Sequence, residues 1–220
     1  HVGDAGGPES AARDVRYAAL AEAAAEHGAI RVLLGHTLDD QAETVLLGLA
    51  RGSGAGSLKG MAADTGASLR PLLAVPRSTT VQFCADSGIV AWNDPHNLDT
   101  SYTRVRVRQT VLPMLESELG PGIRDALART ADQAREDSEA LDHFAEEMAE
   151  DLADMSEAGI SLPVGALAAN PAALRQRLIR LAVFSEFHVS LSRTHTLEIA
   201  RLVTDWRGQG PIDVPGVRVE

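Results

Sequence analysis

Three ionisable side chains, His36, Asp40 and Glu43, stand together where an apolar run ends and a helical pattern begins. The apolar run at residues 29–34 predicts a buried strand, and the pattern after Gly35 predicts a helix. Spacings of four and three residues place the three side chains on one face of that helix. Ligands of open α/β sheets bind outside the carboxyl ends of the strands, so the cluster occupies a position suited to chemistry.

The residue types in this cluster allow three interpretations. Thr37 or Asp39 could simply cap the helix, whose dipole favours acidic side chains near its N-terminus. The His-x-x-x-Asp-x-x-Glu spacing could bind zinc, but this signal is weak because no cysteine accompanies it and Asp39 adds negative charge. A carboxylate pair that holds Mg²⁺ beside a phosphate, or that holds an ammonium group, fits the residue types better.

A second group of polar residues follows at positions 93–108 and ends in three arginines, Arg104, Arg106 and Arg108. Their alternation with valine, taken alone, favours a strand. In a helix, Arg104 and Arg108 would share one face and Arg106 would point elsewhere. The arginines then either form a solvated basic surface or bind an anion such as phosphate through their guanidinium groups.

Three further features carry weaker signals. Arg16 lies on a predicted helix at residues 8–26, where its position suggests a surface side chain. The glycine-rich segment at residues 52–60 predicts a flexible loop, a linker or a mobile cover over substrate, and it lacks the Lys-Ser/Thr ending of a Walker motif. Cys84 lies in an apolar helical pattern and is expected to be packed rather than reactive.

Bulk composition indicates a globular protein of 220 residues with 45% hydrophobic residues. The single cysteine excludes an internal disulfide and favours a reducing cytoplasm. No apolar run is long enough to span a bilayer and no secretory signal is visible, so we expect no membrane association. Residues 116–157 contain 14 acidic residues and three arginines, so this segment alone accounts for the net charge of −11. A locally basic surface elsewhere is therefore compatible with the acidic total.

The order of predicted elements favours an α/β fold with a parallel sheet over residues 1–119. Its predicted elements are a helix at 8–26, a strand at 29–35, a helix to about 51, an extended segment at 69–76, a helix through 83 and a strand at 89–92. Two strands are too few for such a sheet, so we expect this domain to be incomplete at its N-terminus, with further strands before His1.

A mostly helical domain is predicted for residues 120–220, with the boundary near 118–122. A long amphipathic helix with acidic residues on its solvated face comes first and reaches Met155. A helix capped by Asn170, with Pro171 at its first position, runs to about His188. A helix at 193–206 and a hairpin at 212–219, turned at residues 215–216, complete the domain.

Three stretches of this sequence resemble the tRNA(Ile)-lysidine synthases, a family of N-type ATP pyrophosphatases. They are GHTLDDQAETVLLGLARGSG at 35–54, LRPLL at 69–73 and WNDPHNLDTSYTRVRVRQTVLPML at 92–115. The stretch TDWRGQGP at 204–211 resembles the middle domain of the same family. The resemblance implies a Rossmann-like, adenine-nucleotide alpha-hydrolase-like sheet domain followed by a smaller helical domain.

The resemblance also implies an activity, the modification of the wobble cytidine in a tRNA(Ile) whose anticodon is CAU. ATP would adenylate the C2 oxygen of the base and release pyrophosphate, and free L-lysine would then displace AMP. The implied cofactors are ATP and Mg²⁺, and the implied partners are tRNA(Ile) and free L-lysine. The location would be cytoplasmic, and the oligomeric state is left open, with a homodimer among the options.

Residue roles can be carried over where the motifs match. The resemblance implies that His36, Asp40, Glu43 and Arg104 are catalytic residues. Within this set Asp40 and Glu43 would hold the substrate lysine, and Asp40 would hold Mg²⁺. The resemblance assigns nucleotide binding to three arginines, namely Arg16, Arg104 and Arg108. It places Arg51 and Lys59 near the tRNA.

The sequence also departs from the family pattern. Val105 stands where the family has asparagine, Gln109 stands where it usually has histidine, and the Ser-Gly-Gly-x-Asp-Ser loop that binds pyrophosphate is absent. We expect that loop upstream of His1 and therefore expect this chain alone to be inactive. Two alternatives stay open, a related tRNA thiolation pyrophosphatase and a nonenzymatic RNA-binding adaptor. The first would use paired cysteines, which the lone Cys84 argues against, and the absent loop favours the second.

Overall fold

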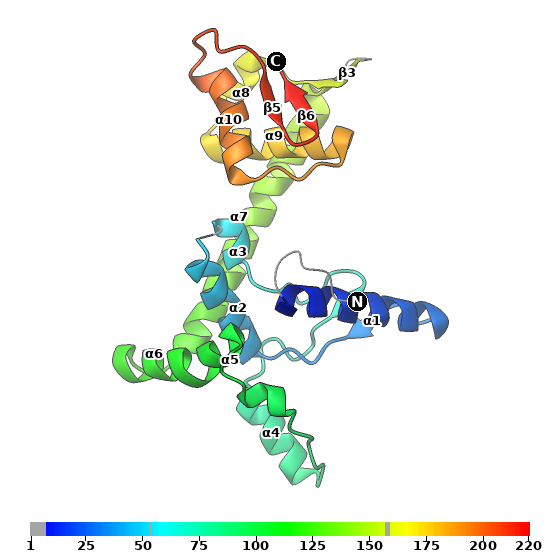
Figure 1. Ribbon diagram of the computed structural model, residues 1–220, viewed down its shortest axis with the longest axis vertical. Coiled ribbons are helices and arrows are strands. Elements are labelled where there is room, and N and C mark those ends of the chain that lie inside the picture. The colour runs from blue at the N-terminus through cyan, green and yellow to red at the C-terminus, as the bar shows by residue number, and fades with distance from the viewer. Residues whose placement is uncertain (1–7, 53, 157–158) are drawn as a thin grey trace. The chain divides into compact units, whose positions relative to one another are not determined.

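The computed structural model describes residues 8–52, 54–156 and 159–220 (Figure 1). The chain forms two compact units, His1–Arg135 and Glu136–Glu220, which are considered separately. The division falls inside a long helix, whereas the sequence places a domain boundary near residues 118–122. That boundary stays a prediction. In the described part of the chain no helix is both long and apolar enough to cross a membrane.

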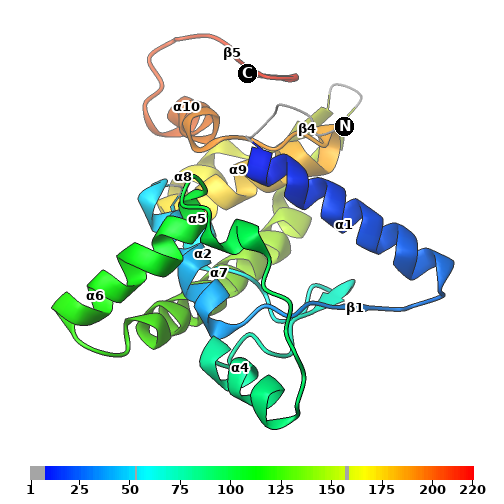
Figure 2. The same ribbon diagram turned by 60° about the horizontal axis from the view of Figure 1, so that its bottom comes forward.

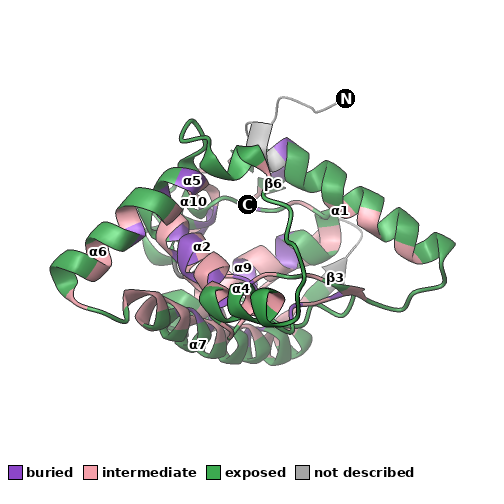
Figure 3. Ribbon diagram, turned by 90° about the horizontal axis from the view of Figure 1, so that it is seen from below, coloured by how far each residue is buried: buried purple, intermediate pink, exposed green. Residues whose placement is uncertain are grey.

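Helices make up most of the first unit, and the predicted helix at 8–26 is confirmed. Its elements are α1 (Pro8–Glu26), β1 (Val32–Leu33), α2 (Leu38–Ala50), α3 (Ala55–Leu58), β2 (Ser68–Leu69), α4 (Arg77–Asp86), η1 (Pro95–Leu98), α5 (Thr103–Arg106), η2 (Val107–Val111), α6 (Leu112–Leu119) and the first half of α7 (Ile123–Leu152). The core forms where α2 meets η2, α6 and α7, around Ala42, Val107 and Leu112. Buried residues occur along α2, whereas α1 and α4 are largely exposed (Figure 3).

The predicted parallel pairing is present but short. Val32 pairs with Ser68 and Leu33 with Leu69, in parallel register. The prediction of a buried strand at 29–35 is wrong, because only two residues are strand and Leu33 is 69% exposed. A parallel strand becomes buried when neighbouring strands and helices cover it on both faces. In the described part of the first unit, β1 has β2 as its single strand neighbour.

The strand predicted at 89–92 is also absent. These residues follow the turn at Gly88, whose φ of +67° suits glycine, and Val90 and Trp92 are 95% and 80% exposed. A strand is stabilised by cross-strand partners rather than by its own residue preferences. No such partner is present for this segment among the described residues, so its β-forming residue types alone do not produce a strand.

The arginine–valine alternation at 104–108 is helical, as the alternative interpretation allowed. α5, η2 and α6 follow one another without a break, and η2 is a π-helical turn. Val105 and Val107 are both buried here, although their spacing suits a strand better than a helix. Arg104 and Arg108 share a face, and Arg106 points elsewhere and bonds the carbonyls of Thr100 and Ser101.

The glycine-rich segment at 52–60 is not simply a flexible loop, because it contains α3 and is fastened to α2. The side-chain amide of Gln41 donates to the Met61 carbonyl at 3.1 Å and accepts from the Met61 N–H at 2.8 Å. A Cβ atom added at Gly48 would lie 2.7 Å from the Ser57 carbonyl oxygen, so α2 and α3 touch where only glycine fits. The Arg135 guanidinium also donates to the Lys59 carbonyl.

The second unit consists of helices and short hairpins. Its elements are the second half of α7, β3 (Asp154–Ser156), β4 (Gly159–Ser161), α8 (Val164–Ala169), α9 (Ala172–Phe187), α10 (Arg193–Thr204), β5 (Ile212–Val214) and β6 (Val217–Val219). The helices α9 and α10 appear with β5 in Figure 2. Core residues Ile179, Val183, Ile199 and Val214 join α9, α10 and the terminal hairpin.

Most elements predicted for the second unit are confirmed, including the long helix, α9, α10 and the hairpin turned at 215–216. The long helix ends at Leu152, so Met155 lies in β3 and not on the helix. The capping prediction for Asn170 is wrong. Its side-chain amide donates back to the Ala166 carbonyl at 2.8 Å, and Pro171 occupies the N-cap of α9. The Asn170 side chain therefore provides a hydrogen-bond donor to a carbonyl of α8. The sequence patterns did not predict this helix.

Candidate active site

The polar cluster at the start of α2 begins with a helix cap. Asp40 Oδ2 accepts hydrogen bonds from both the backbone N–H and the hydroxyl of Thr37, each at 2.9 Å. These bonds satisfy donors at the helix N-terminus and fix the orientation of the Asp40 carboxylate. The capping interpretation is therefore partly right. One oxygen of Asp40 belongs to the cap, and the other, Oδ1, points to arginines.

Glu43 lies one helical turn further along α2, and its side chain is fully buried. Three guanidinium groups surround it. Arg108 donates to Oε1 at 2.7 Å and to Oε2 at 3.0 Å, in a bidentate pair. Arg104 Nε lies 3.2 Å from Oε2, and Arg77 Nη1 lies 3.5 Å from Oε1. Buried carboxylates persist in proteins when paired in this way, so Glu43 is the centre of the cluster.

Asp40 shares two of these arginines. Arg77 Nη2 contacts Asp40 Oδ1 at 2.8 Å, and Arg108 Nη2 contacts the same oxygen at 3.3 Å. Burial alone would raise the pKa of Asp40, but the hydrogen bonds from Thr37 and the charges of Arg77 and Arg108 outweigh it and lower that pKa. Hydrogen bonding to Glu43 raises the pKa of Arg108 despite its burial. Both shifts favour the charged forms of Asp40 and Arg108 at neutral pH.

The ion pairs extend through Asp39 to the start of α7. Asp39 accepts from the Arg77 backbone N–H at 2.7 Å and lies 3.2 Å from Arg124 Nε. Arg124 also contacts Glu116 at 3.2 Å. Four carboxylates (Asp39, Asp40, Glu43, Glu116) thus face four guanidinium groups (Arg77, Arg104, Arg108, Arg124), and the network is neutral. It links α2, α4, α5, η2, α6 and α7, so it also stabilises the first unit.

A second set of basic groups gathers around His36, at the carboxyl ends of β1 and β2. Arg70 is 6% exposed and donates to the Ala62 carbonyl at 2.7 Å and to the Tyr17 hydroxyl at 3.2 Å. Arg16 lies beside the Tyr17 ring, 5.6 Å from its centroid. Burial, followed by the charges of Arg70 and Arg16, lowers the pKa of His36 despite the opposing charge of Asp40. The imidazole is therefore neutral at pH 7.

This second set has spare hydrogen-bonding capacity. His36 Nδ1 and Arg70 Nε are buried atoms that have no hydrogen-bond partner in the described part of the chain. Nor does any carboxylate of the described residues pair with Arg70. Buried guanidinium groups favour an anion at hydrogen-bonding distance. These residues therefore fit the phosphates of a nucleotide, with Arg16, His36 and Arg70 as the groups that would hold them.

The predicted Mg²⁺ site at Asp40 does not fit the arrangement of the side chains. Both oxygens of Asp40 and both oxygens of Glu43 already contact Thr37 or a guanidinium group. The described residues contain no group of three or more acidic, histidine or cysteine side chains that could hold a metal ion. A magnesium ion binds through anionic or neutral oxygens and is repelled by guanidinium groups at the same oxygens.

The predicted tRNA contacts lie in the segment after α2. Arg51 is exposed at the C-terminal end of α2, and Lys59, which is half-buried, follows α3. Neither side chain forms an ion pair with the described residues, which leaves both charges available to an anionic partner. Their role in RNA binding stays a prediction.

The structure adds residues that the motifs did not single out. Arg77 and Arg124 contact the acidic residues of α2, although they are 37 and 85 positions away from Asp40 and Asp39. Arg70 lies within the LRPLL stretch at 69–73, and the family resemblance of this stretch was the signal that could have identified it. Arg77 follows Pro76 at a predicted helix start, a weak signal. Cys84 is a half-buried free thiol on α4, a helix without a buried residue, so its packing stays a prediction.

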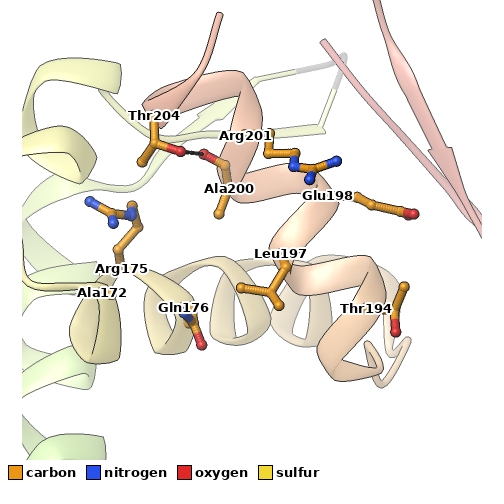
Figure 4. A pocket seen from close by; sticks show the side chains of 9 residues that line it. All are labelled: Ala172, Arg175, Gln176, Thr194, Leu197, Glu198, Ala200, Arg201 and Thr204. Carbon is orange, nitrogen blue, oxygen red and sulfur yellow. Dashed lines mark hydrogen bonds between the residues drawn. The ribbon is translucent and has the colours of Figure 1, made fainter.

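A separate hollow of about 530 Å³ lies in the second unit between α9 and α10 (Figure 4). Arg175 and Gln176 line it from α9, and Glu198 and Arg201 line it from α10. Arg175 already donates to the Leu167 and Asn170 carbonyls. The guanidinium of Arg175 thus already has hydrogen-bond partners within the unit. We interpret the hollow as the groove between two packed helices.

Comparisons with known proteins agree with these observations. Residues 3–115 match the family model described as a PP-loop domain, and residues 162–220 match the one described as the TilS substrate binding domain. The tRNA(Ile)-lysidine synthase of Leifsonia xyli subsp. xyli is 62% identical over 216 residues, which cover 98% of this chain and 65% of that protein.

Other relatives carry the same name. The tRNA(Ile)-lysidine synthase of Streptomyces coelicolor is 53% identical over 98% of this chain and 62% of its own length. That of Thermobifida fusca is 50% identical over 99% of this chain and 67% of its own length. The chain therefore spans about two thirds of the curated relatives that it matches. With its PP-loop and substrate-binding parts both present, the chain belongs to the tRNA(Ile)-lysidine synthase family.

Proposed function

We propose that the protein is a ligase that joins lysine to C2 of the wobble cytidine in CAU-anticodon tRNA(Ile). The observation that carries this proposal is the 62% identity to a tRNA(Ile)-lysidine synthase along nearly the whole chain. Those clusters also have the chemistry that the reaction needs. One combines carboxylates with arginines, and the other presents buried basic groups with unused donors.

The proposed reaction has two steps. In the first, the C2 carbonyl oxygen of cytidine attacks the α-phosphorus of ATP, and pyrophosphate leaves with the bonding electron pair. In the second, the neutral side-chain amine of lysine attacks C2, the bond from C2 to the adenylate oxygen breaks, and AMP leaves. ATP supplies the activation that turns a poor leaving oxygen into a good one. The amine must lose a proton before its attack, so a neutral base beside the site is useful.

We propose residue roles that the geometry of the two clusters supports. Arg16, His36 and Arg70 would bind the phosphates, and the low pKa of His36 keeps its imidazole able to accept a proton at pH 7. Asp40 and Glu43 would hold the ammonium of lysine, and this requires that at least one guanidinium group moves away from them. Arg104 and Arg108 then stay beside the carboxylates and would stabilise negative charge on the adenylated base.

The rest of the proposal concerns partners and location. Arg51 and Lys59 would contact tRNA phosphates from the segment between α2 and α3. The division into an ATP pyrophosphatase domain at 1–119 and a helical domain at 120–220 would separate the chemistry from part of the RNA binding. We propose a cytoplasmic location because CAU-anticodon tRNA is modified where translation occurs, and we leave a homodimer as an open option.

The product tests the proposed function. The full-length gene product is incubated with ATP, L-lysine and CAU-anticodon tRNA(Ile), and the tRNA is digested to nucleosides for mass spectrometry. We expect the wobble cytidine to gain the mass of lysine less one water, and only when ATP and lysine are both present. A sulfur-for-oxygen mass change would instead support the thiolation alternative. An unmodified cytidine with bound tRNA would support the nonenzymatic adaptor.

The role of Asp40 can be tested separately with Asp40→Asn. One charge-assisted contact is worth roughly 1.5–3 kcal/mol, so we expect turnover to fall more than tenfold. Asp64→Asn is the matched control, because Asp64 forms an exposed pair with Arg31 outside the site. Turnover that is unchanged in Asp40→Asn would mean that this carboxylate serves only as a helix cap.

A further inference from the structure

Helix α4 is held to the first unit mainly at its first residue. None of its residues, Arg77–Asp86, is buried, and Val81 and Phe83 are 63% and 65% exposed. In Figures 1 and 2 the helix lies at the margin of the unit and is joined at its N-terminal end. That end is held by the Arg77 N–H bonded to Asp39 and by the Arg77 side chain on Asp40. An element with so little buried surface is among the first to move.

The three arginines on Asp40 and Glu43 are not equally fastened. Arg108 makes a bidentate pair with Glu43 and reaches Asp40 as well. Arg104 bonds the Thr44 hydroxyl at 2.7 Å in addition to its contact with Glu43. Val105 follows Arg104 and Val107 precedes Arg108, and both valines are buried. These two arginines are therefore anchored on a packed helix.

Arg77 differs in both respects. Its guanidinium makes one short contact, to Asp40 Oδ1 at 2.8 Å, and a longer one of 3.5 Å to Glu43 Oε1. The three arginine side chains are similarly exposed, at 26–30%, but the helix that carries Arg77 has no buried residue. Arg77 is thus the one of the three guanidinium groups that is carried by a helix without a buried residue, so it can leave the two carboxylates together with that helix. Its departure would expose Asp40 Oδ1 and Glu43 Oε1 on the side that α4 now occupies.

We propose that Arg77 is an exchangeable cation, whose place on Asp40 and Glu43 is taken by the ammonium group of the substrate, and that α4 moves away with it. This inference rests on the proposed function, because that function supplies the ammonium. Charge balance supports a monovalent occupant. The network holds four carboxylates and four guanidinium groups, so an ammonium in place of Arg77 keeps it neutral. A divalent ion at the same place would leave one excess positive charge.

Arg77 would then be a positioning residue with a measurable signature. It protects the carboxylate pair when no substrate is bound, and it competes with lysine for that pair. Removal of the competitor should strengthen lysine binding, whereas removal of a merely structural contact should weaken it. The two roles thus predict changes of opposite sign in the dissociation constant for lysine.

The test is isothermal titration of L-lysine into the full-length gene product and its Arg77→Gln variant. Loss of one partly exposed ion pair corresponds to roughly a fivefold change in affinity, so we expect the Kd for lysine to fall about fivefold. Arg77→Lys should restore a Kd close to that of the unaltered protein. Arg31→Gln is the matched control, because it removes the same charge from an exposed pair in the same unit and should leave the Kd unchanged.

Hydrogen exchange gives an independent readout of the movement. Lysine should speed amide exchange across residues 77–86 in the unaltered protein, since the Arg77 N–H would lose its bond to Asp39. An equal or higher Kd in Arg77→Gln with a native circular dichroism spectrum would overturn the exchange, as would the absence of lysine binding to either protein. Lysine addition to the tRNA, measured separately, decides the proposed function. If the protein adds lysine to the tRNA but Arg77→Gln leaves the Kd for lysine unchanged, the exchange is wrong and the proposed function stands.

Discussion

At the scale of single residues, Glu43 determines whether the cluster can exist at all. Its carboxylate is fully buried, and three arginines from two other segments of the chain converge on it. A buried charge with partners on every side is costly to break, even where the pair adds little net stability when compared with an apolar core. Glu43 therefore holds the cluster together, and its proposed contact with lysine would place a functional demand on the same side chain.

Glu43→Gln should destabilise the protein strongly. The amide cannot balance Arg108, whose guanidinium is 26% exposed and thus only partly screened by water. Breaking a buried pair costs about 3 kcal/mol, and partial exposure brings this to about 2 kcal/mol. Urea unfolding measures the loss, with Glu118→Gln as an exposed control that should change the free energy of unfolding by less than about 0.5 kcal/mol. Equal effects in the two variants would mean that the buried network contributes nothing.

The pKa shifts of His36 and Asp40 predict a stability that falls on acidification in two stages. The pKa of His36 is lowered in the folded state, so the unfolded chain takes up a proton first as the pH drops through about 6.5. The pKa of Asp40 is also lowered, so its contribution is present above about 3.9 and is lost as the pH falls further. Unfolding free energies from pH 8 to pH 3 should show both stages.

Variants separate the two stages. Asp40→Asn should flatten the stage below about pH 4 and leave the stage near pH 6.5 in place. In the unaltered protein, the His36 ring resonances followed by NMR should titrate with a midpoint below 6.5. A midpoint above 6.5 would show that the charge of Asp40, rather than burial and the charges of Arg70 and Arg16, dominates the environment of this imidazole.

At the scale of elements, the sequence patterns correctly predicted helices and turns that depend on interactions between residues close together in the chain. The helix α2 was predicted because its cap, its acidic first turn and its apolar face all lie within residues 35–51. The hairpin at 212–219 was predicted from its turn for the same reason. The prediction of a strand at 89–92 was wrong because a strand depends on partners that are distant in the sequence, and a local pattern does not reveal them.

The same limit applies to the candidate site. Asp40 and Glu43 could be singled out because their spacing places them on one helix face. Arg77 and Arg124 could not, because their contacts with α2 depend on how α4 and α7 pack against it. The fastening of residues 52–60 was missed as well. Its key contact, Gln41 with Met61, joins residues 20 positions apart.

Gly48→Ala tests whether α3 packs closely against α2. The added Cβ would lie 2.7 Å from the Ser57 carbonyl oxygen, and a backbone atom cannot yield as a flexible side chain would. We expect a loss of about 1–3 kcal/mol in the free energy of unfolding, as for overpacked sites. Gly56→Ala is the control, since its added Cβ meets nothing within 4 Å. If both variants are equally stable in thermal melts, α3 does not pack against α2 as described.

At the scale of the whole molecule, the proposed function requires an acidic protein to bind an acidic polymer. The net charge of −11 is concentrated in residues 116–157, which leaves the remainder of the chain balanced. Arg51 and Lys59 lie outside that acidic segment. Binding to tRNA can therefore depend on local basic side chains although the total charge opposes it.

Arg51→Ala and Lys59→Ala should each weaken tRNA binding and reduce its salt dependence. A side chain that contacts one phosphate contributes about one unit to the slope of log K against log salt. Filter binding at several salt concentrations measures this slope. Arg31→Ala serves as the control because Arg31 is already paired with Asp64. A slope that stays the same in both test variants would place the tRNA elsewhere on the protein.

The proposed ligation of lysine to a tRNA at the expense of ATP can be followed through the release of AMP. The full-length gene product is assayed with ATP and CAU-anticodon tRNA(Ile), with and without L-lysine. We expect AMP release to rise with lysine concentration and to saturate. Norleucine, which lacks the side-chain amine, should give little release. AMP release that is equal with and without lysine, or no release at all, would contradict the proposed ligation.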